Sequence, residues 1–339
     1  MSARIIQGKS YQSLLLIGLF LGLILLLGCF VASVALGVAD IGPQAVYQAL
    51  VAPDGSTAHL IIRTVRVPRS LTALLVGSAI AVAGAMMQGL TRNPLAEPGI
   101  LGINAGAAFA VVLSVFLLNT SSLSLYAVFA LIGAAVAAVT VYSLGSLGRG
   151  GLTPLNLTIA GAALTALVSS LTMAMLILSQ RTLEEIRFWL AGSVAGRDIE
   201  LVVQVLPYLA VGLCLGLAMG KQLTTLSLGE EMAQGLGQNT LWIKGLAAVS
   251  IVLLAGGSVA IAGPISFLGL IVPHIVRVWT GADYRWTLPY SAVAGAILLL
   301  LADVVARLII QPQELPVGIV MPILGAPFFV CLVRSQVRR

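Results

Sequence analysis

The 339-residue chain is 59% hydrophobic and only 9% charged, and its mean hydropathy is +1.06. A soluble domain carries about 25% charged residues, so these values exclude a soluble protein and predict an all-α polytopic membrane protein. The net charge of +6 is scattered between apolar segments. We therefore expect contact with membrane lipid and no nucleic-acid partner.

Apolar segments long enough to cross a membrane recur along the whole chain. A bilayer core about 30 Å thick takes about 20 apolar residues of helix. Nine segments are clear candidates: 14–37, 71–90, 101–118, 124–145, 157–178, 201–219, 242–262, 288–310 and 317–333. A tenth, 264–279, is shorter and contains Pro264 and Pro273. We expect it to form a broken crossing or a half-buried segment.

The first segment has the charge pattern of a secretory signal peptide, because Arg4 and Lys9 precede its apolar run. Its apolar core of about 23 residues is longer than the usual 7–15 residues of a signal peptide. We therefore expect a retained transmembrane helix.

Charges between the segments predict the orientation. With ten crossings and the N-terminus inside, the inner segments carry eleven of the 18 Lys and Arg but only four of the 12 Asp and Glu. Both ends of the chain are basic, so the positive-inside rule predicts cytoplasmic termini and an even number of crossings. Arg63, Arg66 and Arg69 then lie outside, against that rule.

Small residues form one face of segment 71–90. Such faces let helix backbones approach closely in lipid, so tight helix packing is the expected role of this face. Its members are Gly77, Ser78, Ala81, Gly84, Ala85 and Gly89.

Between two apolar segments, the insert 228–242 is polar and helix-forming. Glu230 and Glu231 come early and Gly235 and Gly237 come late, as in a short capped helix. This insert is either a docking element on the inner side or a solvated loop.

Motifs for chemistry are absent from the sequence. No phosphate-binding loop, HExxH or GxSxG motif occurs, so we expect no enzyme and an energy source on a partner. Asp303 is the main charge within an apolar segment, and Arg307 follows at i+4. A local ion pair and a functional role for Asp303 both remain open. An ion-coupled secondary transporter would need a mid-membrane site, and Asp303 is its one candidate.

Five long motifs identify a family resemblance. They are RVPRSLTALLVGSAIAVAGAMMQGLTRNPLAEPGILGINAGA (66–107), LGEEMAQGLG (228–237), AGPISFLGLIVPHIVR (262–277), LLLADVVAR (299–307) and ELPVGIVMPILGAPFFVCLVR (314–334). In order and spacing the chain resembles the FecCD family over roughly residues 60–335. This family comprises permease subunits of ABC importers for iron–siderophore complexes, haem and vitamin B12.

The resemblance implies a type II ABC importer permease fold, with about ten transmembrane helices in a single domain, 1–339. It also implies a second permease subunit, identical or different, two ABC ATPase subunits and a substrate-binding protein. The expected location is the cytoplasmic (inner) membrane. The expected substrate is a ferric siderophore, with haem or vitamin B12 as alternatives. No cofactor is expected on this chain, because the partner subunits use the ATP. No metal site is expected on it either.

The resemblance also assigns roles to individual residues. Arg66, Arg69 and Arg307 match arginines that meet acidic residues of the binding protein, and Arg–carboxylate pairs suit such a contact. Segment 228–237 matches the coupling helices that dock on the ATPase. Segment 151–161 matches the loop before the fifth helix, which closes the path at its cytoplasmic end, so Thr153 and Pro154 are expected at this gate. Pro154 stands where the vitamin B12 permease has a hydroxyl residue. The coupling residues are Gly229, Glu230, Ala233, Leu236 and Gly237.

Overall fold

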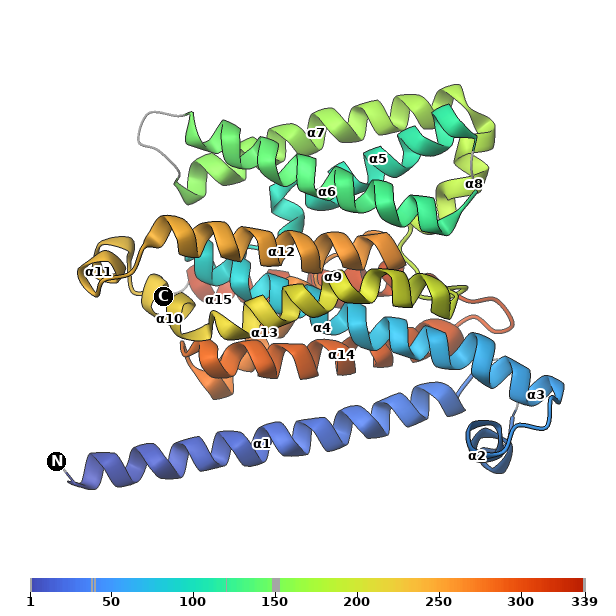
Figure 1. Ribbon diagram of the computed structural model, residues 1–339, viewed down its shortest axis with the longest axis horizontal. Helices are drawn as coiled ribbons and strands as arrows, with labels where there is room; N and C mark the ends of the chain where they lie inside the picture. Colours follow the sequence, from blue (N-terminus) through green and yellow to red (C-terminus); the bar gives the residue numbers. More distant parts are fainter. Residues whose placement is uncertain (1, 38, 40, 120, 148–152, 338–339) are drawn as a thin grey trace.

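The computed structural model describes residues 2–37, 39, 41–119, 121–147 and 153–337, and within these residues every regular element is a helix (Figure 1). Ten helices correspond to the ten predicted segments. They are α1 (Ser2–Ala35), α4 (Val67–Thr91), α5 (Ile103–Leu118), α6 (Leu123–Ser146), α7 (Pro154–Leu178), α9 (Ile199–Ala218), α12 (Thr240–Ala262), α13 (Leu268–Thr280), α14 (Tyr284–Leu308) and α15 (Val317–Val337).

Shorter helices connect these ten. They are α2 (Pro43–Val51), α3 (Thr57–Leu60), the π-helix η1 (Ile61–Arg66), the 3₁₀-helix η2 (Pro98–Leu101), α8 (Gln180–Leu190), α10 (Gly220–Ser227) and α11 (Glu230–Gly235). Helix α1 begins and α15 ends at the end of the bundle that carries α11 (Figure 1). Helices α2, α3 and α8 lie at the opposite end. We call these the α11 end and the α8 end.

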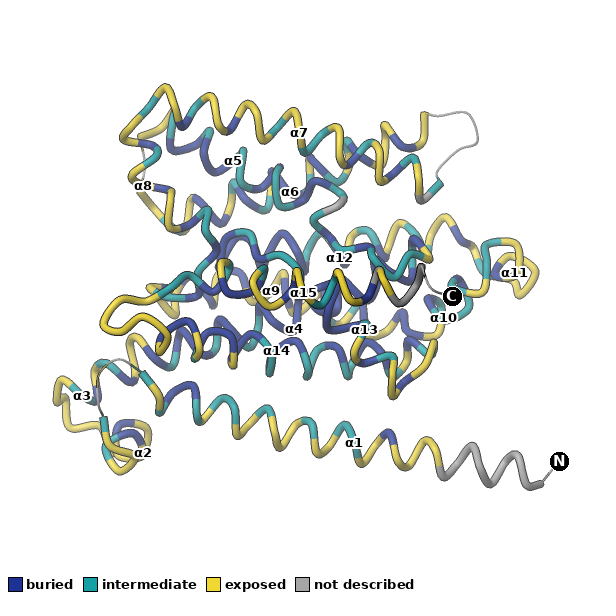
Figure 2. Tube along the Cα trace, turned by 180° about the vertical axis from the view of Figure 1, so that it is seen from behind, coloured by how far each residue is buried: buried dark blue, intermediate teal, exposed yellow. Residues whose placement is uncertain are grey.

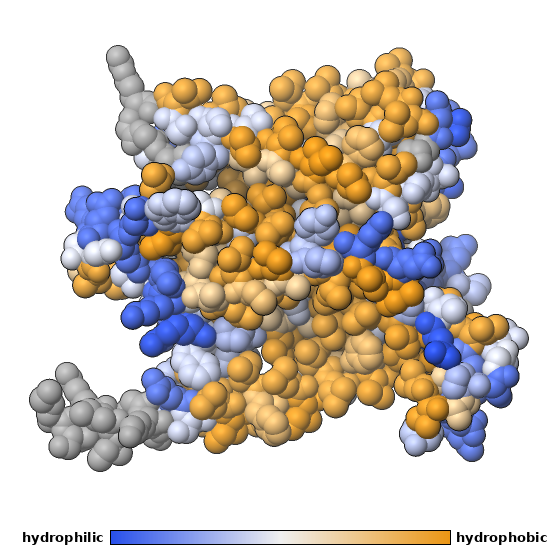
Figure 3. Space-filling model, in the orientation of Figure 1, coloured by the Kyte–Doolittle hydropathy of each residue, from blue (hydrophilic) through white to orange (hydrophobic). Residues whose placement is uncertain are grey.

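The length and composition of the helices fit a membrane. In the described part of the chain, seven helices are long and apolar enough to cross a bilayer, and α5, α13 and the apolar part of α15 are shorter. An apolar band runs across the middle of the molecule, and hydrophilic residues gather at its two ends (Figure 3). The predicted broken crossing 264–279 forms a non-helical start followed by the 13-residue α13. The prediction of an all-α protein with about ten transmembrane helices is therefore confirmed.

Helix α4 occupies the centre of the bundle, where its small-residue face meets two neighbouring helices. A Cβ built on Gly77 would lie 2.5 Å from the carbonyl oxygen of Gly295 in α14. One built on Gly84 would overlap the carbonyl group of Gly269 in α13. The predicted role of this face in close packing is confirmed, because only glycine leaves room for the backbones to touch.

Helices α1 and α7 lie at opposite edges of the bundle and expose most of their apolar side chains (Figure 2). Only 11% of the most apolar window is buried in each, compared with 83% for the span that contains α4. Their exposed faces are therefore available for contact with lipid or with another subunit. Because α1 buries so little, polar contacts at its ends contribute strongly to its attachment.

Candidate functional site

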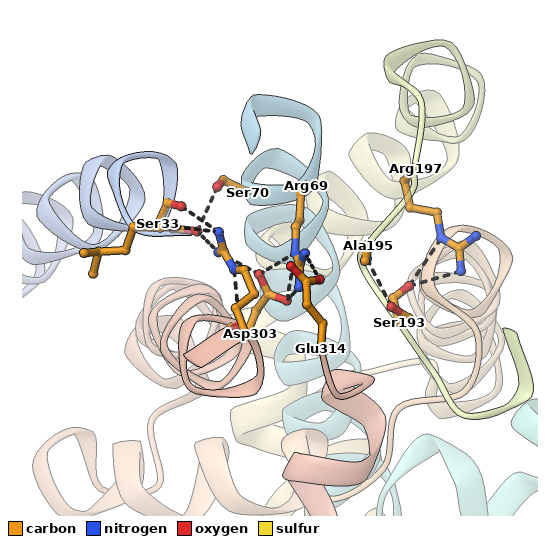
Figure 4. Close-up of polar contacts among 10 residues, drawn as sticks. Ser33, Arg69, Ser70, Ser193, Ala195, Arg197, Asp303 and Glu314 are labelled. Carbon is orange, nitrogen blue, oxygen red and sulfur yellow. Dashed lines mark hydrogen bonds and ion pairs between the residues drawn. The ribbon is translucent and has the colours of Figure 1, made fainter. Parts of the chain in front are cut away.

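Three predicted docking arginines, Arg66, Arg69 and Arg307, come together at the α8 end, although Arg307 is far from the others in sequence. We call them the arginine cluster. Their residues are only 4%, 5% and 2% exposed. All three side chains are held by partners within the chain, and Figure 4 shows several of these contacts. They do not present free charges on the surface.

Asp303 joins two members of the arginine cluster. Its carboxylate accepts hydrogen bonds from Nε and Nη2 of Arg69 at 3.0 and 2.9 Å, and Arg307 Nη2 lies 2.8 Å from its Oδ2. Asp303 is 1% exposed, so both ion pairs are shielded from water. The Nη1 group of Arg69 also pairs with Glu314, just before α15. Asp303 and Arg307 therefore form the local ion pair that the i+4 spacing permitted, and Arg69 extends it.

Two members of the cluster cap the C-terminal end of α1. Arg66 Nη1 donates to the carbonyl oxygens of Val34 and Ala35 at 3.1 and 2.6 Å. Arg307 Nη1 donates to those of Ser33 and Leu36, both at 2.9 Å. The last carbonyls of a helix have no partner in the helix itself, so these guanidinium groups satisfy them.

Loss of the Arg66 side chain tests this capping role. We expect Arg66→Gln to destabilise the folded protein by about 1–3 kcal/mol, because buried carbonyl groups lose their charged donor. Thermal unfolding in detergent measures the change. Arg63 is exposed and one turn away, so Arg63→Gln is the matched control and should have little effect. Equal stability of the two variants would contradict the capping role.

Arg197 is a fourth buried arginine at the α8 end, and no sequence pattern distinguished it from other loop cations. It lies between α8 and α9, and its Nε and Nη2 donate to the carbonyl oxygen of Ser193 at 3.3 and 3.2 Å. Among the described residues no carboxylate lies within 4 Å of it, and burial lowers its pKa to about 10. It lines a 400 Å³ pocket together with Trp189 and Glu314.

The predicted coupling segment 228–237 forms α11 and its flanking residues at the α11 end. Gly229 precedes the helix with φ of +130° and Gly237 follows it with φ of +81°, conformations that favour glycine. Ala233 is fully buried and fixes the helix to the bundle. Leu236 is 66% exposed, and Met232, one turn before it, is 58% exposed. Exposed apolar side chains on a short polar segment are typical of a protein-binding surface.

Glu230 anchors α11 to α12, a contact that the sequence did not predict. Its Oε1 lies 2.6 Å from Nζ of Lys244 and also accepts a hydrogen bond from Thr240 Oγ1. The hydrogen bond from Lys244 lowers the pKa of Glu230 below its ordinary value. The carboxylate of Glu230 is therefore ionised at neutral pH, and the contact weakens when acid protonates it.

At the start of α7, the two predicted gate residues have structural roles. Thr153 is the N-cap, and its Oγ1 accepts a hydrogen bond from the backbone N–H of Asn156 at 3.2 Å. Pro154 occupies the first helical position, where its missing N–H has no effect. Residues 148–152 lie outside the described part of the chain. Control of a gate by Thr153 and Pro154 stays a prediction, as does the docking role of the arginine cluster.

Comparisons with known proteins agree with this architecture. Residues 23–335 match the model of the FecCD transport family. The chain is 49% identical over 310 residues to the probable siderophore transport system permease protein YfiZ of Bacillus subtilis (strain 168), covering 91% of this chain and 93% of that protein. It is 41% identical over 319 residues to the ferric enterobactin transport system permease protein FepD of Escherichia coli (strain K12), covering 94% and 95%.

A solved structure shares the same helix arrangement. It is an inward-facing conformation of a metal-chelate type ABC transporter, with a TM-score of 0.80 and 32% sequence identity. The match covers 94% of this chain and 98% of the other. The sequence match extends over nearly the whole bundle, including the arginine cluster and α11. The chain is a multi-pass membrane protein and belongs to the FecCD transport family.

Proposed function

We propose that the chain is the permease subunit of an ATP-driven importer that moves a ferric siderophore across the cytoplasmic (inner) membrane. The observation that supports this most strongly is the match over nearly the full length to permeases of siderophore transport systems. The chain itself performs no chemistry on the chelate. Its helices provide half of a path, and a second permease subunit, identical or different, provides the other half.

In this proposal the α11 end faces the cytoplasm and the α8 end faces outward. Two ABC ATPase subunits bind at the α11 end, where Met232 and Leu236 expose apolar side chains. A substrate-binding protein docks at the α8 end, above the arginine cluster. Hydrolysis of ATP then moves α11, and the Glu230–Lys244 pair transmits that movement to α12.

Alternative substrates and mechanisms make different demands on the chain. Haem or vitamin B12 would use the same machinery, and the relatives named above favour siderophores. An ion-coupled carrier would need a titratable group free to bind the ion. Asp303 pairs with Arg69 and Arg307, so it does not provide such a group.

Uptake of radiolabelled iron tests the proposed function. The chain is reconstituted in vesicles with its second permease subunit, its ATPase subunits and its binding protein, and ferric siderophore is supplied on the α8 side. We expect uptake that needs ATP at the α11 side and survives collapse of ion gradients. Uptake driven by an ion gradient without ATP would contradict the proposal.

Glu314 offers a test of docking that leaves the buried core intact. It is 34% exposed and pairs with Arg69, so it competes with any acidic group that approaches this arginine. If the binding protein contacts Arg69 through a carboxylate, Glu314→Gln should strengthen docking several-fold, measured by binding to the chain in nanodiscs. Unchanged or weaker docking would exclude Arg69 as the contact.

The exposed side chains of α11 provide the matching test at the other end. We expect Met232→Glu with Leu236→Glu to reduce ATPase attachment at least about tenfold, because charges replace an apolar contact surface. Co-purification of the ATPase measures attachment. Tyr47→Glu makes the same kind of change at an exposed position in α2, at the α8 end, and should leave attachment unchanged. Loss of attachment in this control, or retention in the α11 variant, would contradict the assignment.

A further inference from the structure

A large cavity opens between α6 and α12 in the half of the bundle nearest the α11 end. Its volume is 880 Å³. The two helices touch near the middle of α6, where a Cβ built on Gly256 would lie 3.0 Å from Cβ of Ala134. They diverge toward the α11 end (Figure 1). There a Cβ on Gly245 would meet nothing within 4 Å. We call this space the α6–α12 cavity.

The polar groups of the α6–α12 cavity gather at one end. Away from the α11 end, the walls of the cavity are apolar, with Ala138 on α6 and Val249 and Leu253 on α12. At the α11 end the lining changes to polar and amphipathic side chains. These are Thr91, Arg92, Tyr142, Thr153, Glu230, Trp242 and Lys244. This distribution fits an amphiphile with one polar end.

Exposure of the cavity walls shows how such a molecule would enter. Val139 on α6 is 66% exposed and Val249 on α12 is 50% exposed. Both lie within apolar spans, so this side of the cavity faces the hydrocarbon of the bilayer. Trp242, 68% exposed, stands at the mouth, where indole rings favour the headgroup level. The cavity is therefore continuous with the leaflet at the α11 end.

Charge at the mouth selects the headgroup. Arg92 ends α4 with φ of +50°, and no carboxylate of the described residues lies within 4 Å of it. Lys244 pairs with Glu230. Two cations therefore share one carboxylate, which leaves one positive charge uncompensated. Basic pockets between membrane helices bind anionic lipid headgroups for this reason.

We infer that the α6–α12 cavity binds an acyl chain of an anionic phospholipid, with the lipid phosphate at Arg92 and Lys244. The lipid would touch Thr153 at the start of α7 and Glu230 in α11. One lipid molecule would therefore contact both the predicted gate and the predicted coupling segment. This inference requires no ATPase or binding protein, so it stands independently of the proposed function.

Quenching of Trp242 fluorescence by brominated phospholipids tests the inference. The full chain is reconstituted in vesicles with brominated phosphatidylglycerol or brominated phosphatidylcholine, and subtraction of a Trp242→Phe variant isolates the Trp242 signal. We expect phosphatidylglycerol to bind about fivefold more strongly, the preference that one basic residue typically gives. Arg92→Gln should remove most of this preference. Arg285→Gln, an exposed cation at the same end that pairs with Asp283, should preserve it.

A second pair of variants tests the apolar part of the site. Gly245→Leu should fill the cavity without a clash and reduce quenching by both lipids. Gly28→Leu places the same side chain on the open face of α1 and should leave quenching unchanged.

Three results would overturn the inference. The first is equal quenching by the two lipids. The second is protection of Trp242 from both lipids, which would mean that another protein chain covers the cavity. The third is loss of quenching when ferric citrate is added, which would assign the cavity to the chelate.

Discussion

Asp303→Asn is expected to destabilise the protein by about 3–5 kcal/mol, because it leaves two buried guanidinium groups without their shared carboxylate. The side chains of Arg69 and Arg307 are 6% and 3% exposed, so water cannot replace the lost charge. A neutral amide keeps the size of the side chain but supplies only one acceptor oxygen. Most of the folded protein should be lost on extraction from the membrane, as measured by size-exclusion chromatography and thermal unfolding.

Glu314→Gln is the matched control, because Glu314 is the other acidic partner of Arg69 and is partly exposed. Ion pairs open to solvent contribute about 0–1 kcal/mol, so this variant should remain folded. Similar losses in the two variants would mean that burial of the charge does not determine the effect. If Asp303→Asn were as stable as the wild type, the ion pairs of Asp303 with Arg69 and Arg307 would not stabilise the fold.

Gly84→Val is expected to be the most damaging change in the centre of the bundle. Its new Cβ would overlap the backbone of Gly269, so α4 and α13 would have to separate. Overpacking costs about 1–3 kcal/mol where neighbours can yield, and a backbone yields less than a side chain. We expect a loss at the upper end of this range or beyond, with little folded protein recovered.

Gly28→Val provides the comparison for this prediction. Gly28 lies on the exposed face of α1, where a Cβ meets nothing within 4 Å. The same substitution should therefore change the unfolding temperature very little. If the two valine variants were equally stable, close contact of α4 with α13 would not exist in the folded protein.

Much of the fold could be predicted from the sequence, because each helix that crosses a bilayer needs about 20 mostly apolar residues. The ten segments and the small-residue face of α4 follow from local composition. The Asp303–Arg307 pair was one of two open alternatives, since its spacing of four residues places both on one helical face. Local patterns of this kind are contained in a single helix, so they are visible in one sequence.

Contacts between distant segments could not be predicted in the same way. The hydrogen bonds of Arg66 to the end of α1 cross about thirty residues and depend on the path of α2, α3 and η1. Lys244 meets Glu230 only because α11 folds back on α12. The family resemblance identified the arginine cluster, but it gave a partner outside the chain and missed those inside it. Arg197 had no local signal, because it lies in a loop and lines a pocket with residues that are distant in sequence, such as Glu314.

The caps on α1 also constrain how the chain is assembled. Ribosomal synthesis delivers α1 first and Arg66 soon after it, whereas Arg307 follows only when α14 is complete. Until then, the carbonyl oxygens of Ser33 and Leu36 lack the donor that they have in the finished protein. An unpaired carbonyl is costly in lipid, so the end of α1 must remain near water or the insertion machinery while the intervening helices are made. Synthesis of Arg307 therefore completes the cap on α1 and links this helix to α14, which is made much later.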